Sequence, residues 1–167
     1  MKALITGCSG FIGSHLADLL LNEGLEIFGI THRGYTVNID HIKDRITLIK
    51  LDITKREEVE NLIHEIKPDY VFHLAAQSLV TVSWEDPETT LKTNVLGTLY
   101  LLDAIHKESI DPVIVVACSS AEYGANESVI PTDENNPLRP TSVYAISKVA
   151  TDMLAELYSK SYKMKII

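Results

Sequence analysis

Two side chains suited to proton transfer lie four residues apart in the segment YAISK. Tyr144 and Lys148 place a phenol and an ammonium on one face of a predicted helix. A nearby cation stabilises the phenolate, so such a tyrosine can act as an acid or a base near neutral pH. Taken singly, this pair is more often a surface pair than a catalytic one. Ser119 follows an apolar run, which places its hydroxyl where a predicted strand ends.

A second group of residues has the spacing of a phosphate-binding turn. In TGCSGFIGSH, Gly7, Gly10 and Gly13 are three residues apart, and Phe11 and Ile12 stand before the last of them. In a strand–turn–helix unit these glycines permit a sharp turn, close approach to a pyrophosphate and close packing of the helix. A flexible glycine-rich loop is the alternative. The position between a predicted strand and a predicted helix favours a dinucleotide-binding turn.

The residues after the second predicted strand bear on the choice of dinucleotide. A carboxylate that binds the ribose 2′-hydroxyl of NAD is expected about 20 residues after the glycine turn. The sequence there is Thr31-His32-Arg33, without an acidic residue. Arg33 could pair with the 2′-phosphate of NADP, so NADP is favoured over NAD. A solvated loop position for Arg33 is the alternative interpretation.

Alternating strands and helices would position these residues. Apolar runs predict strands at Ala3–Thr6, Glu26–Ile30, Ile46–Ile49, Tyr70–Leu74 and Val113–Ala117, and the start of a sixth at Lys165–Ile167. Helical periodicity predicts helices from Ile12 to Leu20, from Val59 to Ile66, from Pro87 to Lys107 and from Val143 to Tyr162. Strands that are apolar throughout indicate an α/β fold with a three-layer, doubly wound parallel sheet, the Rossmann fold.

Apolar residues recur at helical spacing in two of these helices. The first carries Ile12, Leu16, Leu19 and Leu20, and the third carries Leu91, Val95, Leu99, Leu102 and Ile105. We expect the apolar positions of the third helix to form a buried stripe.

Composition limits the classes of partner and the compartment. The 167 residues carry a formal net charge of −8, which opposes binding to nucleic acid or to an anionic membrane. No apolar run is long enough to span a bilayer and no secretory signal is apparent, so a cytoplasmic protein is expected. The six histidines and two cysteines show no metal-ligand spacing, so no metal site is expected.

Six segments resemble the extended short-chain dehydrogenase/reductase family, also called the NAD-dependent epimerase/dehydratase family. They are TGCSGFIGSH, LDI at 51–53, HLAAQS at 73–78, NVLGT at 94–98, SSAEYG at 119–124 and YAISK at 144–148, and they cover nearly the whole chain. The resemblance implies a nucleotide-sugar enzyme that transfers hydride between a nicotinamide and the sugar C4. It further implies that Tyr144 is the acid/base, that Lys148 supports it and that Ser119 binds the same oxygen.

The resemblance also implies roles in cofactor binding and assembly. Asp52 and Ile53 would border the adenine, and Leu74, Ala75 and Ala76 would line the cofactor cleft. The helices at 87–107 and 143–162 would form a homodimer interface. The family continues into a substrate lobe, so residues 1–167 are expected to be a dinucleotide-binding domain that is truncated at the sixth strand, with the substrate lobe largely missing.

The run HLAAQSLVTVSWEDPE most resembles the branch of GDP-mannose 4,6-dehydratases and GDP-4-keto-6-deoxymannose reductases. The dehydratases carry a glutamate two residues after the catalytic Ser or Thr, and Ala121 stands at that position. Glu122 is displaced by one residue, which normally turns a side chain elsewhere. A GDP-4-keto-6-deoxymannose reductase is therefore favoured. GDP-mannose 4,6-dehydratase, nucleotide-sugar 4-epimerase and a non-catalytic dinucleotide-binding module remain as alternatives.

Overall fold

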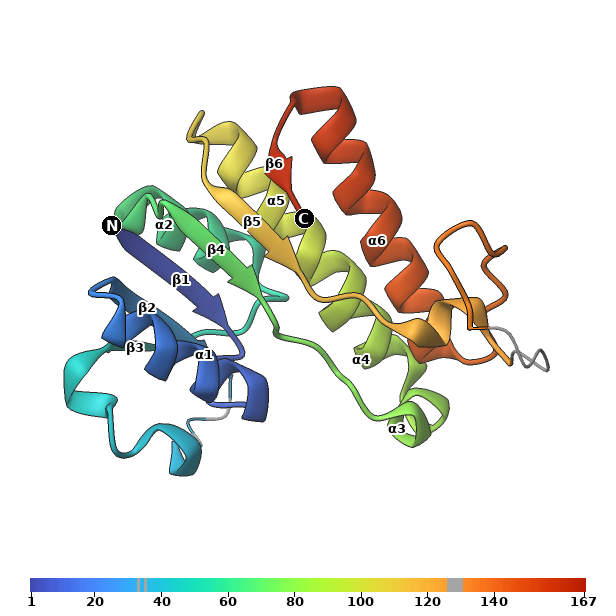
Figure 1. Cartoon of the computed structure of the whole chain (residues 1–167), viewed down its shortest axis with the longest axis horizontal. Helices are drawn as coiled ribbons and strands as arrows, with labels where there is room; N and C mark the ends of the chain where they lie inside the picture. Colours follow the sequence, from blue (N-terminus) through green and yellow to red (C-terminus); the bar gives the residue numbers. More distant parts are fainter. Residues whose placement is uncertain (33, 35, 126–130) are drawn as a thin grey trace.

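A single parallel sheet organises the computed structural model, which describes residues 1–32, 34, 36–125 and 131–167. The strands are β1 (Lys2–Thr6), β2 (Glu26–Thr31), β3 (Thr47–Lys50), β4 (Tyr70–His73), β5 (Val113–Val116) and β6 (Lys165–Ile166). Their order in the sheet is β3-β2-β1-β4-β5-β6, and every neighbouring pair is parallel (Figure 1). The predicted doubly wound parallel sheet is confirmed.

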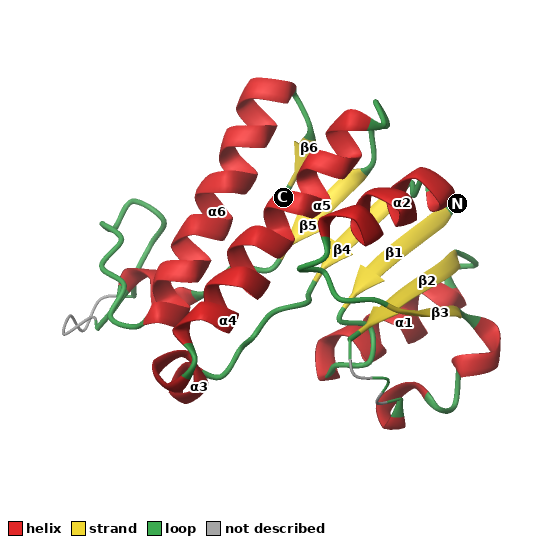
Figure 2. Cartoon of the chain, turned by 180° about the vertical axis from the view of Figure 1, so that it is seen from behind, coloured by secondary structure: helices red, strands yellow, loops and turns green. Residues whose placement is uncertain are grey.

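Helices cover both faces of the sheet. One face carries α2 (Arg56–Ile66), α5 (Gly97–Lys107) and α6 (Val143–Tyr162), which lie in front of the strands in Figure 2. The other face carries α1 (Phe11–Asn22) and the 3-10 turns η1 (Val37–Ile39) and η2 (Lys43–Arg45). The result is the three-layer arrangement of a Rossmann fold.

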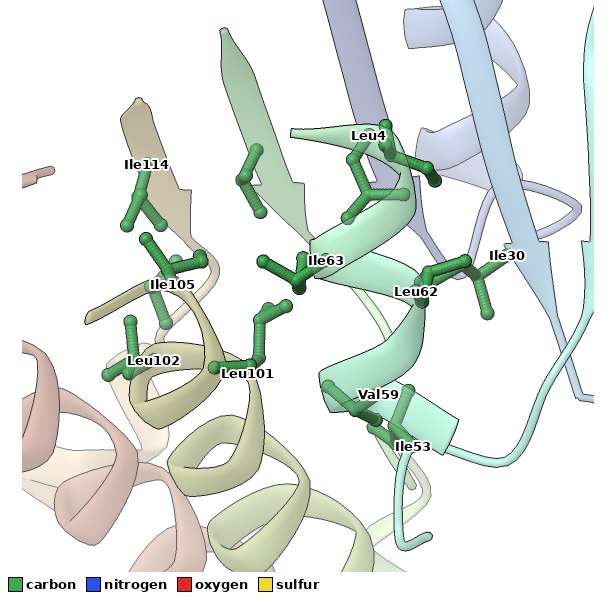
Figure 3. Close-up of a cluster of buried hydrophobic side chains, with 14 of the residues drawn as sticks. Leu4, Ile30, Ile53, Val59, Leu62, Ile63, Leu101, Leu102, Ile105 and Ile114 are labelled. Carbon is green, nitrogen blue, oxygen red and sulfur yellow. The ribbon is translucent and has the colours of Figure 1, made fainter. Parts of the chain in front are cut away.

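The larger core lies between the sheet and α2 and α5. Figure 3 shows Leu62, Ile63 and Leu101 from these helices gathered against Leu4 and Ile114 from the strands. Burying a side chain of this size stabilises the fold by about 1.5–3 kcal/mol. This core fixes the strand ends, and therefore the loops that follow them.

The third predicted helix differs from expectation. It consists of α4 (Pro87–Leu91), a π-turn η3 (Lys92–Leu96) and α5, and a short helix α3 (Val80–Glu85) precedes it. The π-turn adds a residue to one turn and shifts the buried face. Leu91 is therefore 40% exposed, while the polar residues Thr90, Asn94 and Thr98 are buried. The predicted stripe is wrong at Leu91 for this reason.

The apolar residues of the first predicted helix are buried only in part. Ile12 is 67% exposed and Leu19 is 56% exposed, whereas Gly13, Ser14 and Ala17 are buried. The helix α1 presses small residues against the sheet and so approaches it closely. Its exposed apolar residues lie beside the glycine turn or in solvent.

Candidate active site

The glycine turn connects β1 to α1 without a side-chain cap. Gly7 has φ +72°, in the left-handed region that favours glycine, and the N–H of Gly10 donates to the carbonyl of Gly7 at 3.0 Å. A Cβ at Gly13 would lie 2.4 Å from the carbonyl oxygen of Gly7. Because Gly10 caps α1 without a side chain, the free N–H groups of the first turn remain available to an anion.

This turn forms one wall of a cleft with a volume of about 590 Å³ at the carboxyl ends of the strands. The sequence-predicted residues in the cleft wall are Gly7, Gly10, Phe11, Ile12, Gly13, Asp52, Ile53, Leu74, Ala75 and Ala76. The structure thus brings together residues from separate segments of the sequence. Arg33 lies outside the described residues, so its predicted contact with a 2′-phosphate has no structural counterpart here.

Asp52 carries the acidic group of the cleft. Its Oδ1 accepts hydrogen bonds from the backbone N–H and the hydroxyl of Thr54, and its Oδ2 lies 3.7 Å from Nε2 of His32. Burial alone would raise the pKa of Asp52, but the hydrogen bonds from Thr54 and the neighbouring His32 and Lys55 hold it below its usual value. Asp52 is therefore an anionic acceptor beside the His32 ring.

Lys148 is anchored next to the cleft. It lies in α6, is 6% exposed, and donates from Nζ to the carbonyl oxygen of Ala117 at 2.7 Å. Burial lowers the pKa of Lys148, while the neighbouring Cys118 and Glu122 act in the opposite direction. Ala117 lines the cleft, although Lys148 does not. The ammonium is therefore fixed at the border of the cleft.

Tyr144 and Ser119 lie on two elements that pack against each other. Tyr144 is in the first turn of α6, whose N-cap Ser142 accepts a hydrogen bond from the N–H of Ala145 at 3.0 Å. Ser119 caps the 3-10 helix η4 (Ser120–Tyr123), which packs on α6. Both residues are half-buried and neither lines the cleft.

A buried hydrogen-bond network links the glycine-turn strand to the next strand. The hydroxyl of Thr6, at the end of β1, accepts from the N–H groups of Leu74 and Ala75, both at 3.1 Å. Its proton is left to donate to Nδ1 of His73 at 2.8 Å. Nε2 of His73 then donates to the hydroxyl of Thr98 at 2.9 Å. His73 is therefore neutral, and burial lowers its pKa to about 3, with a further effect of the Lys148 charge.

The network continues through the π-turn to α6. The side-chain amide of Asn94 accepts from the N–H of Gln77 at 2.8 Å and donates to the carbonyl of Gln77 at 3.0 Å. It also donates to the hydroxyl of Ser147 at 2.9 Å, and Ser147 donates to the carbonyl of Tyr144 at 2.6 Å. The loop that lines the cleft after β4 and the helix that carries Tyr144 therefore share one polar anchor.

Sequence reasoning missed part of the cleft wall. His32, Thr54, Ser78, Thr89, Lys92, Thr93 and Ala117 also line it. Three of them, Thr89, Lys92 and Thr93, come from α4 and η3. The sequence predicts one continuous amphipathic helix there, and its periodicity does not mark which residue faces a ligand. The Asn94 anchor was missed for the same reason.

The described residues limit two other classes of site. None of their helices is long and apolar enough to cross a membrane. Within the same residues, no group of three or more His, Cys, Asp or Glu side chains is arranged to hold a metal ion.

The fold and the glycine-lined cleft are those of a Rossmann-type domain. The model of the GDP-mannose 4,6 dehydratase family matches residues 4–167. The chain therefore belongs to that family, within the NAD-dependent epimerase/dehydratase, or extended short-chain dehydrogenase/reductase, enzymes.

Individual relatives agree with this membership. A GDP-mannose 4,6-dehydratase of Vibrio cholerae is 37% identical over 98% of this chain and 47% of its own length. A UDP-glucose 4-epimerase of Mycolicibacterium smegmatis is 33% identical over 98% of this chain and 53% of its own. The chain spans about half the length of the curated relatives it matches.

Solved structures extend the comparison. The UDP-glucose 4-epimerase of Thermus thermophilus, in complex with NAD, has a TM-score of 0.91 and 36% identity, over 99% of this chain and 53% of that one. The dTDP-glucose 4,6-dehydratase DesIV of Streptomyces venezuelae, with NAD and TYD bound, has a TM-score of 0.88 and 29% identity, over 99% of this chain and 54% of that one. The predicted family is confirmed, and these relatives are dehydratases and epimerases. They support the alternatives to the reductase better than the reductase itself.

Proposed function

We propose that residues 1–167 are the dinucleotide-binding domain of a nucleotide-sugar enzyme that oxidises and reduces the sugar at C4. The observation that carries the proposal is the cleft between the glycine turn and Ala117, whose carbonyl holds the Lys148 ammonium at 2.7 Å. A Cβ at Gly7 or Gly13 would press on backbone atoms, so the turn depends on glycine at both positions. A tight glycine turn of this kind lets the backbone approach a pyrophosphate closely, which supports the proposal. A bound NAD or NADP would supply the hydride acceptor.

The proposed chemistry assigns one role to each of three side chains. Tyr144 accepts the proton of the sugar O4 as the C4–H bond breaks and its hydride leaves, which gives a 4-ketone. Lys148 stabilises the phenolate form of Tyr144 that accepts this proton, and Ser119 donates a hydrogen bond to O4. The location of Tyr144 one helical turn before the anchored Lys148 supports these roles.

GDP-mannose is the substrate that the comparisons support best, and a GDP-mannose 4,6-dehydratase is the first candidate activity. A 4-epimerase is the second, because Ala121 stands where the dehydratases carry an acid/base glutamate. Glu122 does not replace that group, since its Oε1 accepts from the backbone N–H of Ser119 at 2.8 Å. An epimerase needs no such acid, because the 4-keto sugar is reduced again from its other face.

The cofactor and the assembly are part of the proposal. The segment Thr31-His32-Arg33 lacks a carboxylate, which supports NADP. The NAD-bound structural neighbours support NAD. Exposed apolar side chains at Leu91, Leu96, Ile146, Met153 and Leu157 on α4, η3 and α6 support a homodimer.

Product analysis separates the candidate reactions. The protein in its natural length is incubated with NAD or NADP and either GDP-mannose or UDP-glucose. A third incubation contains NADPH and GDP-4-keto-6-deoxymannose, and all products are identified by NMR and mass spectrometry. Loss of one water from GDP-mannose supports the dehydratase, and inversion at C4 without loss of mass supports the epimerase. Turnover only of a 4-keto-6-deoxy sugar nucleotide with NADPH would support the reductase. Cofactor binding in calorimetry without any turnover would contradict the enzyme and support the non-catalytic module.

A further inference from the structure

Glu122 is a buried acid whose side chain and backbone carbonyl are both held by hydrogen bonds. The residue is 4% exposed, its Oε1 accepts from the backbone N–H of Ser119 at 2.8 Å, and its carbonyl accepts from the N–H of Arg139 at 2.9 Å. The carboxylate therefore points back along η4 toward Ser119 and is not presented to the cleft. The long loop before α6 holds the same residue from the other side.

The contact between Glu122 and Ser119 is reciprocal. The Ser119 hydroxyl accepts from the N–H of Ala121 at 3.2 Å while Glu122 accepts from the N–H of Ser119, which together form a capping box. A serine hydroxyl carries one proton and two lone pairs. Among the described residues, this hydroxyl accepts one hydrogen bond and donates none. Its proton therefore has no acceptor in the part of the chain that the structure describes and is available to a bound ligand.

The groups around Glu122 together raise its pKa above the usual value. Burial raises the pKa of Glu122, the hydrogen bond from the Ser119 N–H opposes that rise, and Asp152 and Lys148 on α6 act in opposite directions. Protonation would leave a carbonyl oxygen that still accepts from Ser119. The hydrogen bond therefore depends on an acceptor at this position, which an amide also provides.

We propose that Glu122 is a positioning residue that holds Ser119 with its hydroxyl proton directed at the sugar O4. This inference rests on the proposed function, because it assumes that Ser119 binds the reacting oxygen. It gives a role to a side chain that the comparison with dehydratases leaves without one. Glu122 acts through Ser119 and moves no proton itself.

A double-mutant cycle in the natural-length protein tests the inference. Glu122→Met removes the acceptor at similar volume, Glu122→Gln keeps it, and Ser120→Ala is a control at an exposed neighbour. Displacing a donor to the reacting oxygen should lower kcat by about 10- to 100-fold in Glu122→Met, with KM and the Kd for dinucleotide unchanged. Glu122→Gln should restore kcat to within about threefold, and Ser120→Ala should have no effect.

The decisive measurement is the effect of Glu122→Met in the Ser119→Ala background. We expect no further loss of kcat there, because the donor that Glu122 positions is already gone. An equal loss in both backgrounds would overturn the positioning role. A kcat of Ser119→Ala equal to that of the unaltered protein would instead contradict the role of Ser119 in the proposed function. If Glu122→Met does not fold, Glu122→Asp tests the same bond, since its shorter side chain cannot reach the Ser119 N–H.

Discussion

Gly13→Ala tests whether the turn between β1 and α1 is shaped for a pyrophosphate. The added Cβ would lie 2.4 Å from the Gly7 carbonyl oxygen and 2.9 Å from Cα of Cys8. Both are backbone atoms, so no side-chain rotation relieves the clash. The turn must open by about 0.6 Å for the Cβ to reach the 3.0 Å that real contacts respect.

The size of the effect follows from overpacking. Inserting a methyl group into a closely packed region costs about 1–3 kcal/mol. If the turn relaxes by moving its N–H groups away from the phosphate, this cost corresponds to a Kd for dinucleotide raised by about 5- to 150-fold. Isothermal titration calorimetry with NAD and with NADP measures that Kd.

Gly24→Ala provides the matched control. Gly24 has φ +78° and no heavy atom within 4 Å of an added Cβ, so alanine there is strained only by its backbone angle. We expect a loss of stability of about 1–2 kcal/mol and an unchanged Kd. A Gly13→Ala protein that binds dinucleotide within twofold of the unaltered protein would refute the assignment of the turn to the pyrophosphate.

Three further outcomes are expected. The folded-state pKa of His73 is about 3 against 6.5 for a free imidazole, so its stability contribution is full above pH 6.5 and is lost as the pH falls toward 3. His73→Gln should reduce the pH dependence of the free energy of unfolding between pH 6.5 and 4 by about 1.4 kcal/mol per pH unit, and equal slopes in urea titrations would contradict this. Tyr158→Phe removes a 2.5 Å hydrogen bond to Asp103 and should cost about 1.5 kcal/mol in chemical denaturation; no loss would show that the bond adds nothing net. Ser142→Ala removes the N-cap of α6 and should cost about 1 kcal/mol by the same measurement, with an unchanged midpoint arguing against the cap.

The sheet and the glycine turn could be predicted because their signals are local. A strand of a parallel sheet with helices on both faces is apolar throughout, as in Val113–Val116. Such a run can be recognised because the segments on either side of it are not continuously apolar. The turn needs glycine for steric reasons that act within one short segment, from Gly7 to Gly13. Together, the glycine turn and the family motifs identified about half of the residues that line the cleft.

The π-turn and its polar contacts could not be predicted in the same way. Periodicity assumes that buried positions are apolar, yet Thr98 and Asn94 are buried because their partners lie far away in sequence, at His73, Gln77 and Ser147. No single-sequence pattern encodes such pairs. Glu122 is different, because Ser119-x-x-Glu122 is the spacing of a capping box and could have indicated the contact.

The central position of β1 has a consequence for synthesis of the chain. One edge of β1 pairs with β2, but the other pairs with β4, and the N–H of Lys2 donates to the Asp69 side chain 67 residues away at 2.7 Å. Ribosomes add about 5–20 residues per second, so roughly 3–13 s separate the two strands. During that interval β1 has an open edge. The glycine turn, which packs on Ala75, therefore reaches its final shape only after residues 70–75 have been made.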